Sequence, residues 1–336
     1  MLYTRRDIGK IALAAGAASR LLSAKPNSVF GGVQIGTITY SFRALPSSAE
    51  QVLQYCLDCG ISAIELMSNV AESYAGAPAG GGRGAGGPGG GGQGRSRGGR
   101  GQMTPEQQAA MQKAQQEMKD WRLSVSMDKY KAFRKLYNDA GISIYAFKLP
   151  PTMNMSAQEY DYIWNVAETL GANHVTMELP TDDALLQRVG EYAARRKLRI
   201  AFHTHGQGGD SGFEKALGAS PYTALNLDCG HYFGVNGKSP VPVIVKYHDR
   251  IASLHLKDRK GPDHPAAAGD APAPGGGGPN MPWGQGETPL HEILQTLKKN
   301  KYGFPASIEY EYNTPEGSDV LTEVKKCVQY CKDALA

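Results

Sequence analysis

Carboxylate and imidazole side chains stand at the ends of five apolar segments in the second half of the chain. Oxygen and nitrogen donors of this kind, without a thiolate, are typical ligands of Mn²⁺, Mg²⁺, Co²⁺ or Zn²⁺. A cation held there would polarise a carbonyl or hydroxyl oxygen and stabilise an enediolate. The pattern therefore predicts one divalent metal ion of unknown identity. The segments end in Glu178, in His203-Thr204-His205, in Asp228 with His231 three residues later, in His255 with Lys257 two residues later, and in Glu309.

Three of these side chains carry the metal prediction most directly. Asp228, His255 and Glu309 offer two carboxylates and one imidazole from three successive segments. Taken singly, each could be a buried polar group that bonds to a neighbour, and we expect that role for His174, which starts its segment. Taken together, they indicate a common metal centre.

Eight short apolar segments must position these residues. Most are rich in β-branched or aromatic residues, and a helical pattern follows each. Eight alternating strand and helix units predict an α/β fold of the (β/α)8 barrel type, whose pocket lies at the carboxyl ends of the strands. An open doubly wound sheet is the alternative, but no G-x-G-x-x-G pattern follows the first segment. The segments span residues 33–40, 63–67, 142–147, 174–178, 198–202, 223–227, 251–255 and 306–309.

The helices between these strands have recognisable ends. Polar residues and prolines typical of helix starts precede four of them, and glycines close two. The first should run from Pro46-Ser47-Ser48 toward Cys59-Gly60, the second from Ser156 to Gly171, the third from Thr181-Asp182 to Arg196, and the fourth from Pro289 to Lys299.

Two low-complexity insertions interrupt the pattern, at residues 76–102 and 261–283. The first is a Gly/Arg/Pro run that lacks the apolar residues to fold, and the second is a Pro/Ala/Gly run, so we expect disordered or loosely ordered loops. They follow the second and seventh predicted strands, and therefore lie on the rim that carries barrel active sites. The first contains four arginines and could bind RNA. We expect a flexible rim loop instead.

The first 24 residues predict a twin-arginine export signal. Arg5-Arg6 precedes the apolar run 11–18, which is too short to span a bilayer. A chance Arg-Arg pair before an ordinary helix is the alternative. We expect a periplasmic or otherwise extracytoplasmic protein with no stable membrane span, whose single barrel domain covers residues 25–336.

Charge and cysteine content exclude two further classes. The formal net charge is +4, but residues 1–24 contribute a net +3 and the first insertion four arginines, so the remaining chain is weakly acidic. A nucleic-acid partner would need a basic face, and we expect none. Five cysteines are an odd number and fit no disulfide framework.

The strand-end motifs resemble those of the xylose isomerase-like barrel superfamily. The motifs are Asp228-x-x-His231, His255-Leu256-Lys257-Asp258 and Ile308-Glu309-Tyr310, and the similarity covers roughly residues 33–334, insertions excepted. This group of sugar phosphate isomerases and epimerases includes ketose 3-epimerases, hydroxypyruvate isomerase, inosose dehydratase and endonuclease IV.

The resemblance implies a four-residue metal site. In the ketose epimerases a Glu, an Asp, a His and a Glu on the fifth to eighth strands hold the metal. The last three match Asp228, His255 and Glu309, whereas His203 stands where the fifth-strand Glu would be. This departure puts a two-carboxylate epimerase mechanism in doubt. Glu178 could supply the missing oxygen ligand or base.

Further roles follow from the same resemblance. The His203-x-His205 variant resembles the branch that contains inosose dehydratase and exported enzymes acting on 3-keto sugars. We expect His205, His231 and Lys257 to transfer protons or bind an oxyanion, together with Glu178. Glu65 and Lys148 are expected to hydrogen-bond sugar hydroxyls, and Trp283 to offer a stacking surface.

The predicted function is thus an exported, metal-dependent sugar isomerase or epimerase that abstracts a proton next to a carbonyl. A 3-keto-glycoside or inosose-type lyase on the same barrel is the alternative. A non-catalytic sugar-binding protein and an endonuclease IV-like nuclease stay open. The nuclease would need metal-binding histidines where Glu65 and Lys148 stand.

Overall fold

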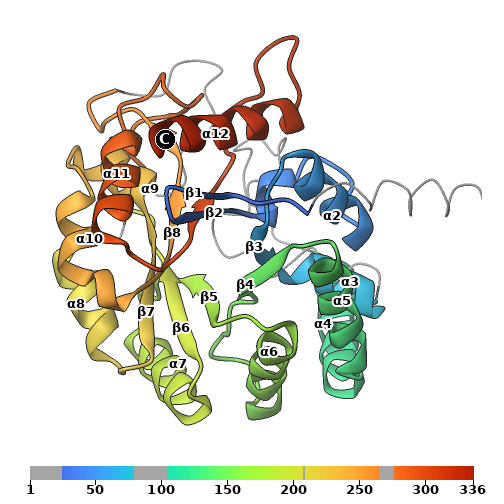
Figure 1. Ribbon diagram of the computed structural model, residues 1–336. Helices are drawn as coiled ribbons and strands as arrows, with labels where there is room; N and C mark the ends of the chain where they lie inside the picture. Colours follow the sequence, from blue (N-terminus) through green and yellow to red (C-terminus); the bar gives the residue numbers. More distant parts are fainter. Residues whose placement is uncertain (1–24, 79–103, 207–208, 265–275) are drawn as a thin grey trace, which may run out of the picture.

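Eight parallel strands close into a barrel in the computed structural model, which describes residues 25–78, 104–206, 209–264 and 276–336 (Figure 1). Each strand pairs with the next, and the last pairs with both the seventh and the first. The predicted (β/α)8 barrel is confirmed. Its strands are β2 (Val33–Ile38), β3 (Ala63–Met67), β4 (Ser143–Lys148), β5 (His174–Glu178), β6 (Arg199–His203), β7 (Thr223–Asp228), β8 (Ile251–Leu256) and β11 (Ala306–Ile308).

Helices surround the strands (Figure 1). Ser48 and Ser156 each form a capping box with the residue three positions later, and Asp182 accepts bonds from two backbone N–H groups, as their positions predict. The helices are α2 (Ala49–Asp58), α3 (Ser68–Ala75), α4 (Pro105–Ser124), α5 (Asp128–Asp139), α6 (Ala157–Leu170), α7 (Asp183–Arg196), α8 (Asp210–Gly218), α9 (Cys229–Asn236), α10 (Val241–Tyr247), α11 (Leu290–Asn300) and α12 (Val320–Ala334), with short 3₁₀ turns η1 (Thr39–Phe42) and η3 (His248–Arg250).

Along each strand, side chains alternate between the apolar core outside the barrel and the barrel interior. On β6, Ile200 and Phe202 belong to the main apolar core, which lies between strands and helices. The alternate residues Ala201 and His203 belong to the barrel interior, where Ala201 packs with Ala224 and Ala252. Small residues at this level leave room for the larger polar side chains above them.

The two insertions differ from the expectation in how they join the barrel. Residues 79–103 lie outside the described part, and α3 separates them from β3. In the second insertion, residues 276–283 pack against the seventh unit, where β10 (Asn280–Met281) pairs with β9 (Asp258–Arg259). A Cβ at Gly278 would overlap the carbonyl oxygens of Lys260 and Gly261. Glycine here permits a close backbone approach that composition does not reveal.

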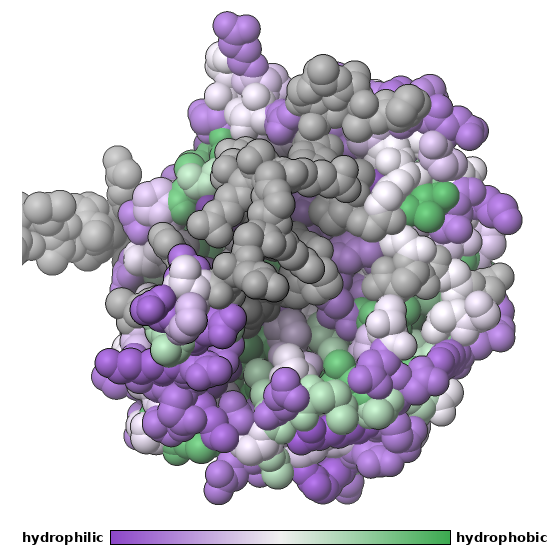
Figure 2. Space-filling model, turned by 180° about the vertical axis from the view of Figure 1, so that it is seen from behind, coloured by the Kyte–Doolittle hydropathy of each residue, from purple (hydrophilic) through white to green (hydrophobic). Residues whose placement is uncertain are grey.

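On the face shown in Figure 2, hydrophilic residues predominate and hydrophobic residues lie among them in smaller groups. No helix in the described ranges combines the length and apolar content needed to cross a bilayer. All five cysteines are free and buried. The predicted export signal lies outside the described residues.

Candidate active site

Four side chains from the last four barrel strands converge at the carboxyl ends. His203 ends β6, Asp228 ends β7, His255 lies near the end of β8, and Glu309 directly follows β11. One donor atom from each can be chosen so that all four lie within 4.8 Å of one another. Each side chain is buried. The four predicted metal ligands therefore form one cluster.

His255 lies between two carboxylates. Its Nδ1 is 2.7 Å from Glu309 Oε2, and its Nε2 is 2.8 Å from Glu65 Oε2. Burial lowers the pKa of His255, but the two carboxylates outweigh this and raise it to about 10. The same contacts bring the pKa of Glu65 to about 2, although burial alone would raise it.

His203 has a different partner. Its Nδ1 is 3.0 Å from Asn226 Oδ1, and its Nε2 faces Asp228 Oδ2 at 3.8 Å. Burial, reinforced by the nearby Lys148 ammonium, holds the pKa of His203 well below its usual value. The ring is therefore neutral, the state in which imidazole can bind a metal.

Lys257 lies among the carboxylates of the cluster. Its Nζ is 3.0 Å from Asp228 Oδ2, 2.9 Å from Glu309 Oε2 and 2.6 Å from Glu311 Oε2. Burial raises the pKa of Asp228 against the influence of Lys257. Glu309 responds in the opposite way, because Lys257 and His255 together outweigh burial and keep its pKa well below the usual value.

The residues present fit a divalent cation. Two imidazoles and two carboxylates form a mixed nitrogen and oxygen donor set. Within the described part of the chain, Asp228 Oδ2 is a buried carboxylate oxygen that accepts no hydrogen bond, although Lys257 forms an ion pair with it. Such an oxygen is a natural metal ligand. A second group of three imidazoles, His203, His205 and His231, also has nitrogens within 4.8 Å of one another.

The more accessible acid–base groups lie beside the cluster. Glu178 ends β5, and its Oε2 is 3.2 Å from His205 Nδ1. Its other oxygen, Oε1, is 3.0 Å from Lys148 Nζ. The side chains of Glu178 and His205 are 25% and 19% exposed, whereas His203, Asp228 and His255 are nearly inaccessible. As whole side chains, this pair is the most exposed of the predicted proton-transfer residues, while Glu178 Oε2 itself is buried.

His231 is buried, and a cationic side chain faces each of its ring nitrogens. Its Nδ1 is 2.7 Å from Arg259 Nη1, and its Nε2 is 3.1 Å from Lys257 Nζ. Both cations only donate, and a neutral imidazole accepts through one nitrogen, so only one of the two contacts is a hydrogen bond; the shorter distance favours Nδ1 as the acceptor. Burial, with both cations adding to it, keeps the pKa of His231 well below the usual value. Its part in proton transfer stays a prediction.

The predicted substrate-binding residues lie at different levels. Lys148 contacts Glu178, which lies beside His205. Glu65 is fully buried beneath His255, so its geometry favours support of the His255 imidazole over contact with a sugar. Trp283 packs edge-on against Tyr330 of α12, with ring centroids 5.7 Å apart. The stacking role of Trp283 stays a prediction.

Sequence reasoning missed two supporting residues. Asn226 lies two residues before Asp228 on β7, and this inward spacing is the signal that could have found it. Arg259 lies two residues after Lys257, is fully buried, and donates to the carbonyl oxygens of Gly276 and Gly278 as well as to His231. It thus ties the end of the second insertion to the site.

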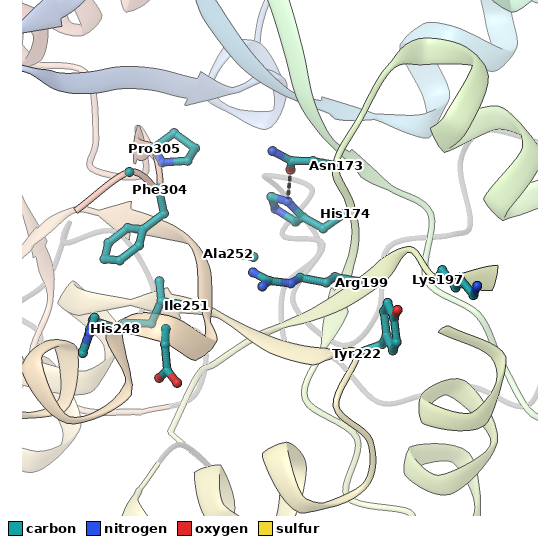
Figure 3. A pocket seen from close by; sticks show the side chains of 12 residues that line it. Asn173, His174, Lys197, Arg199, Tyr222, His248, Ile251, Ala252, Phe304 and Pro305 are labelled. Carbon is teal, nitrogen blue, oxygen red and sulfur yellow. Dashed lines mark hydrogen bonds between the residues drawn. The ribbon is translucent and has the colours of Figure 1, made fainter. Parts of the chain in front are cut away.

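A separate cavity of about 400 Å³ lies at the opposite, amino-terminal ends of the strands. Arg199 extends across it below His174, which bonds to Asn173 (Figure 3). Tyr222, Phe304 and Pro305 are among its other lining residues. It contains none of the predicted site residues, and barrel enzymes use the other end.

Comparison with known proteins identifies the class of barrel fold. A family model described as a xylose isomerase-like TIM barrel matches residues 183–330. A search of curated proteins found no match. The chain shares its fold with solved xylose isomerase-like barrels, and the resemblance predicted from the strand-end motifs is confirmed.

Three of these solved structures are informative. The probable 3-DHS dehydratase from Bacillus anthracis is 15% identical, with a TM-score of 0.57 over 88% of this chain and 98% of that one. The 3-keto-D-glucoside 4-epimerase from E. coli is 10% identical, with a TM-score of 0.54 over 90% and 99%. D-Psicose 3-epimerase from Clostridium cellulolyticum H10, solved with D-tagatose, is 9% identical, with a TM-score of 0.53 over 90% and 99%.

Proposed function

We propose that this chain is an exported, metal-dependent sugar isomerase or epimerase that abstracts a proton next to a carbonyl group. The observation that carries the proposal is the buried cluster of His203, Asp228, His255 and Glu309, with donor atoms within 4.8 Å at the carboxyl ends of the strands. The names of the solved relatives, which include epimerases acting on sugars, support the substrate class.

The chain's own residues supply the proton chemistry. A divalent metal, when bound, supplies Lewis acidity toward the substrate's carbonyl and hydroxyl oxygens. Glu178, whose Oε2 lies beside His205 Nδ1, takes the proton from the carbon next to the carbonyl, and His205 shares that proton. Lys257, held in its charged form by three carboxylates, offsets negative charge on the substrate oxygen.

A dehydratase on the same site is the second candidate. The fold of the probable 3-DHS dehydratase and the Lys148–Glu178 ion pair, 3.0 Å long, favour it. An acid next to the base would protonate a departing hydroxyl group after the first proton is removed. Product analysis separates the two candidates, because an epimerase keeps the substrate's mass and a dehydratase lowers it by one water.

Metal analysis of the purified protein tests the proposal. The wild type should contain about one equivalent of Mn, Co, Mg or Zn, and Asp228→Ala should lose it. Asp139→Ala is a matched control, because this exposed carboxylate pairs only with Lys135 on α5 among the contacts described. It should keep the metal. Retention by Asp228→Ala would contradict the site, and about three zinc ions would favour the nuclease.

Substrate tests complete the experiment. Free ketoses and 3-keto glycosides should be incubated in deuterated water with the metal-loaded wild type. Uptake of deuterium next to the carbonyl is the expected sign of proton abstraction. No exchange with any of these sugars, despite a full metal content, would argue for a binding protein instead of an enzyme.

A further inference from the structure

We infer that Glu65 and Asn226 are positioning residues that fix the two site imidazoles, His255 and His203, from beneath. Both are completely buried inside the barrel, on β3 and β7. Neither lies on the rim, so their action is on the rings and not on a substrate.

Three hydrogen-bond donors contact the carboxylate of Glu65. Thr176 Oγ1 donates to its Oε1 at 2.7 Å, and Asn226 Nδ2 donates to its Oε2 at 2.9 Å. His255 Nε2 lies 2.8 Å from the same Oε2. An ionised carboxylate only accepts, so Nε2 of His255 carries a hydrogen. The nitrogen that faces Glu309 and the rest of the cluster is therefore Nδ1.

Asn226 extends this constraint to the second ring. Its Nδ2 also donates to Ser253 Oγ at 2.8 Å. With Glu65 accepting from Nδ2, the other end of the amide must be the oxygen, and this oxygen lies 3.0 Å from His203 Nδ1. The neutral His203 ring must then carry its hydrogen on Nδ1, which leaves the lone pair of Nε2 pointing toward Asp228.

The two rings are thus fixed through opposite nitrogens. His203 presents Nε2 and His255 presents Nδ1 to the same cluster, and one hydrogen-bonded Glu65–Asn226 pair sets both choices. The tautomer of His203 does not depend on any metal, whereas metal-free His255, which lies between two carboxylates, carries a hydrogen on both nitrogens. The effect of the Glu65–Asn226 pair on metal affinity rests on the proposed function.

Nitrogen NMR of the protein with ¹⁵N-labelled histidine rings tests the tautomers without metal. The wild-type spectrum should contain a neutral ring protonated on Nδ1, and this signal should vanish in His203→Asn, which assigns it. In Asn226→Leu, which keeps the volume and removes the acceptor, His203 should shift toward the form protonated on Nε2. Ser253→Ala is the control, because Ser253 contacts His174 but neither His203 nor His255 among the described residues, and the signals of His203 and His255 should stay unchanged.

A wild-type His203 protonated on Nε2 would overturn the inference, even if Asn226→Leu failed to fold. An unchanged His203 tautomer in a folded Asn226→Leu would also overturn it.

A Co²⁺ titration gives the second measurement. Glu65→Gln keeps an acceptor but removes the negative charge, so it should weaken binding about ten-fold, the lower end of the range for such supporting groups. Ser253→Ala should bind Co²⁺ as the wild type does. Equal affinity in Glu65→Gln and wild type would refute the positioning role of Glu65. A wild type that binds no Co²⁺ would refute the proposed metal centre and leave the tautomer result standing.

Discussion

Each end of the barrel interior holds a buried histidine, and the pKa values of the two are shifted in opposite directions. At the carboxyl end, carboxylates on both sides raise the pKa of His255 to about 10. At the amino end, burial lowers the pKa of His174 to about 4, against the weaker influence of Glu65. Both rings are nearly inaccessible. Burial alone therefore does not define a functional histidine.

The neighbours account for the difference. His174 bonds to neutral groups, Asn173 Oδ1 at 2.5 Å and Ser253 Oγ at 3.1 Å. His255 bonds to two ionised carboxylates. Concentrated charge in a buried region costs free energy unless partners compensate it, and this cost is typical of binding and catalytic sites. The amino end lacks such a concentration among the contacts described.

Of the substitutions we propose, Glu309→Gln should have the largest effect. This effect should be confined to the carboxyl end of the barrel. The substitution removes a predicted ligand and one carboxylate partner of both His255 and Lys257. We expect turnover to fall by about 10²-fold or more and metal to be lost, with the melting curve largely intact. Glu316→Gln, at an exposed position, is the control for assay and metal content. Full turnover in Glu309→Gln would show that the eighth strand is assigned wrongly.

Lys257→Met tests the charge balance directly. Without the ammonium, three carboxylates are left next to one another, and breaking a buried ion pair typically costs about 3–5 kcal/mol. We expect the free energy of unfolding in metal-free buffer to fall by about this amount, and added Co²⁺ to restore part of it. Lys246→Met, whose ion pair with Glu214 is exposed, should change it by less than about 1 kcal/mol. Equal effects of the two variants would contradict the charge balance.

His174 predicts how stability depends on pH at the amino end. Its pKa is lower in the folded protein than in the unfolded chain, so the unfolded chain takes up a proton first as pH falls. Stability is therefore lost between about pH 6.5 and pH 4, by about 3 kcal/mol at most. Denaturant unfolding of His174→Gln across this range should show a flatter profile than the wild type. Parallel profiles would mean that other groups control the acid response.

Much of the barrel was predictable from the sequence, because each strand is a local pattern. β6 ends at His203 and β7 ends at Asp228, the polar residues that the sequence placed at the strand ends. The carboxyl ends of parallel strands must meet at the same end of the barrel. This convergence predicted the metal cluster even though its members lie on separate strands. The reaction and the substrate could not be predicted in the same way, because one fold supports many reactions.

The support beneath the site could not be predicted. Glu65 and His255 are 190 residues apart, and their contact depends on the tilt of the strands, which decides the side chains that share one level of the barrel. The same holds for Arg259 and the carbonyl of Gly278, whose approach depends on a backbone conformation inside a low-complexity segment. Composition indicated a loose loop there and contains no information on this anchor.

Ser253→Ala should have the smallest effect and tests whether the two ends of the barrel are coupled. Ser253 Oγ accepts from Asn226 and contacts His174 Nε2, so it joins the two polar regions. Its loss should lower the free energy of unfolding by about 1 kcal/mol, the usual cost of a lost hydrogen bond. Turnover and Co²⁺ affinity should stay within about two-fold, because Asn226 keeps its bond to Glu65. A larger loss of turnover at unchanged metal content would mean that His174 and the amino-terminal cavity influence the site through this serine.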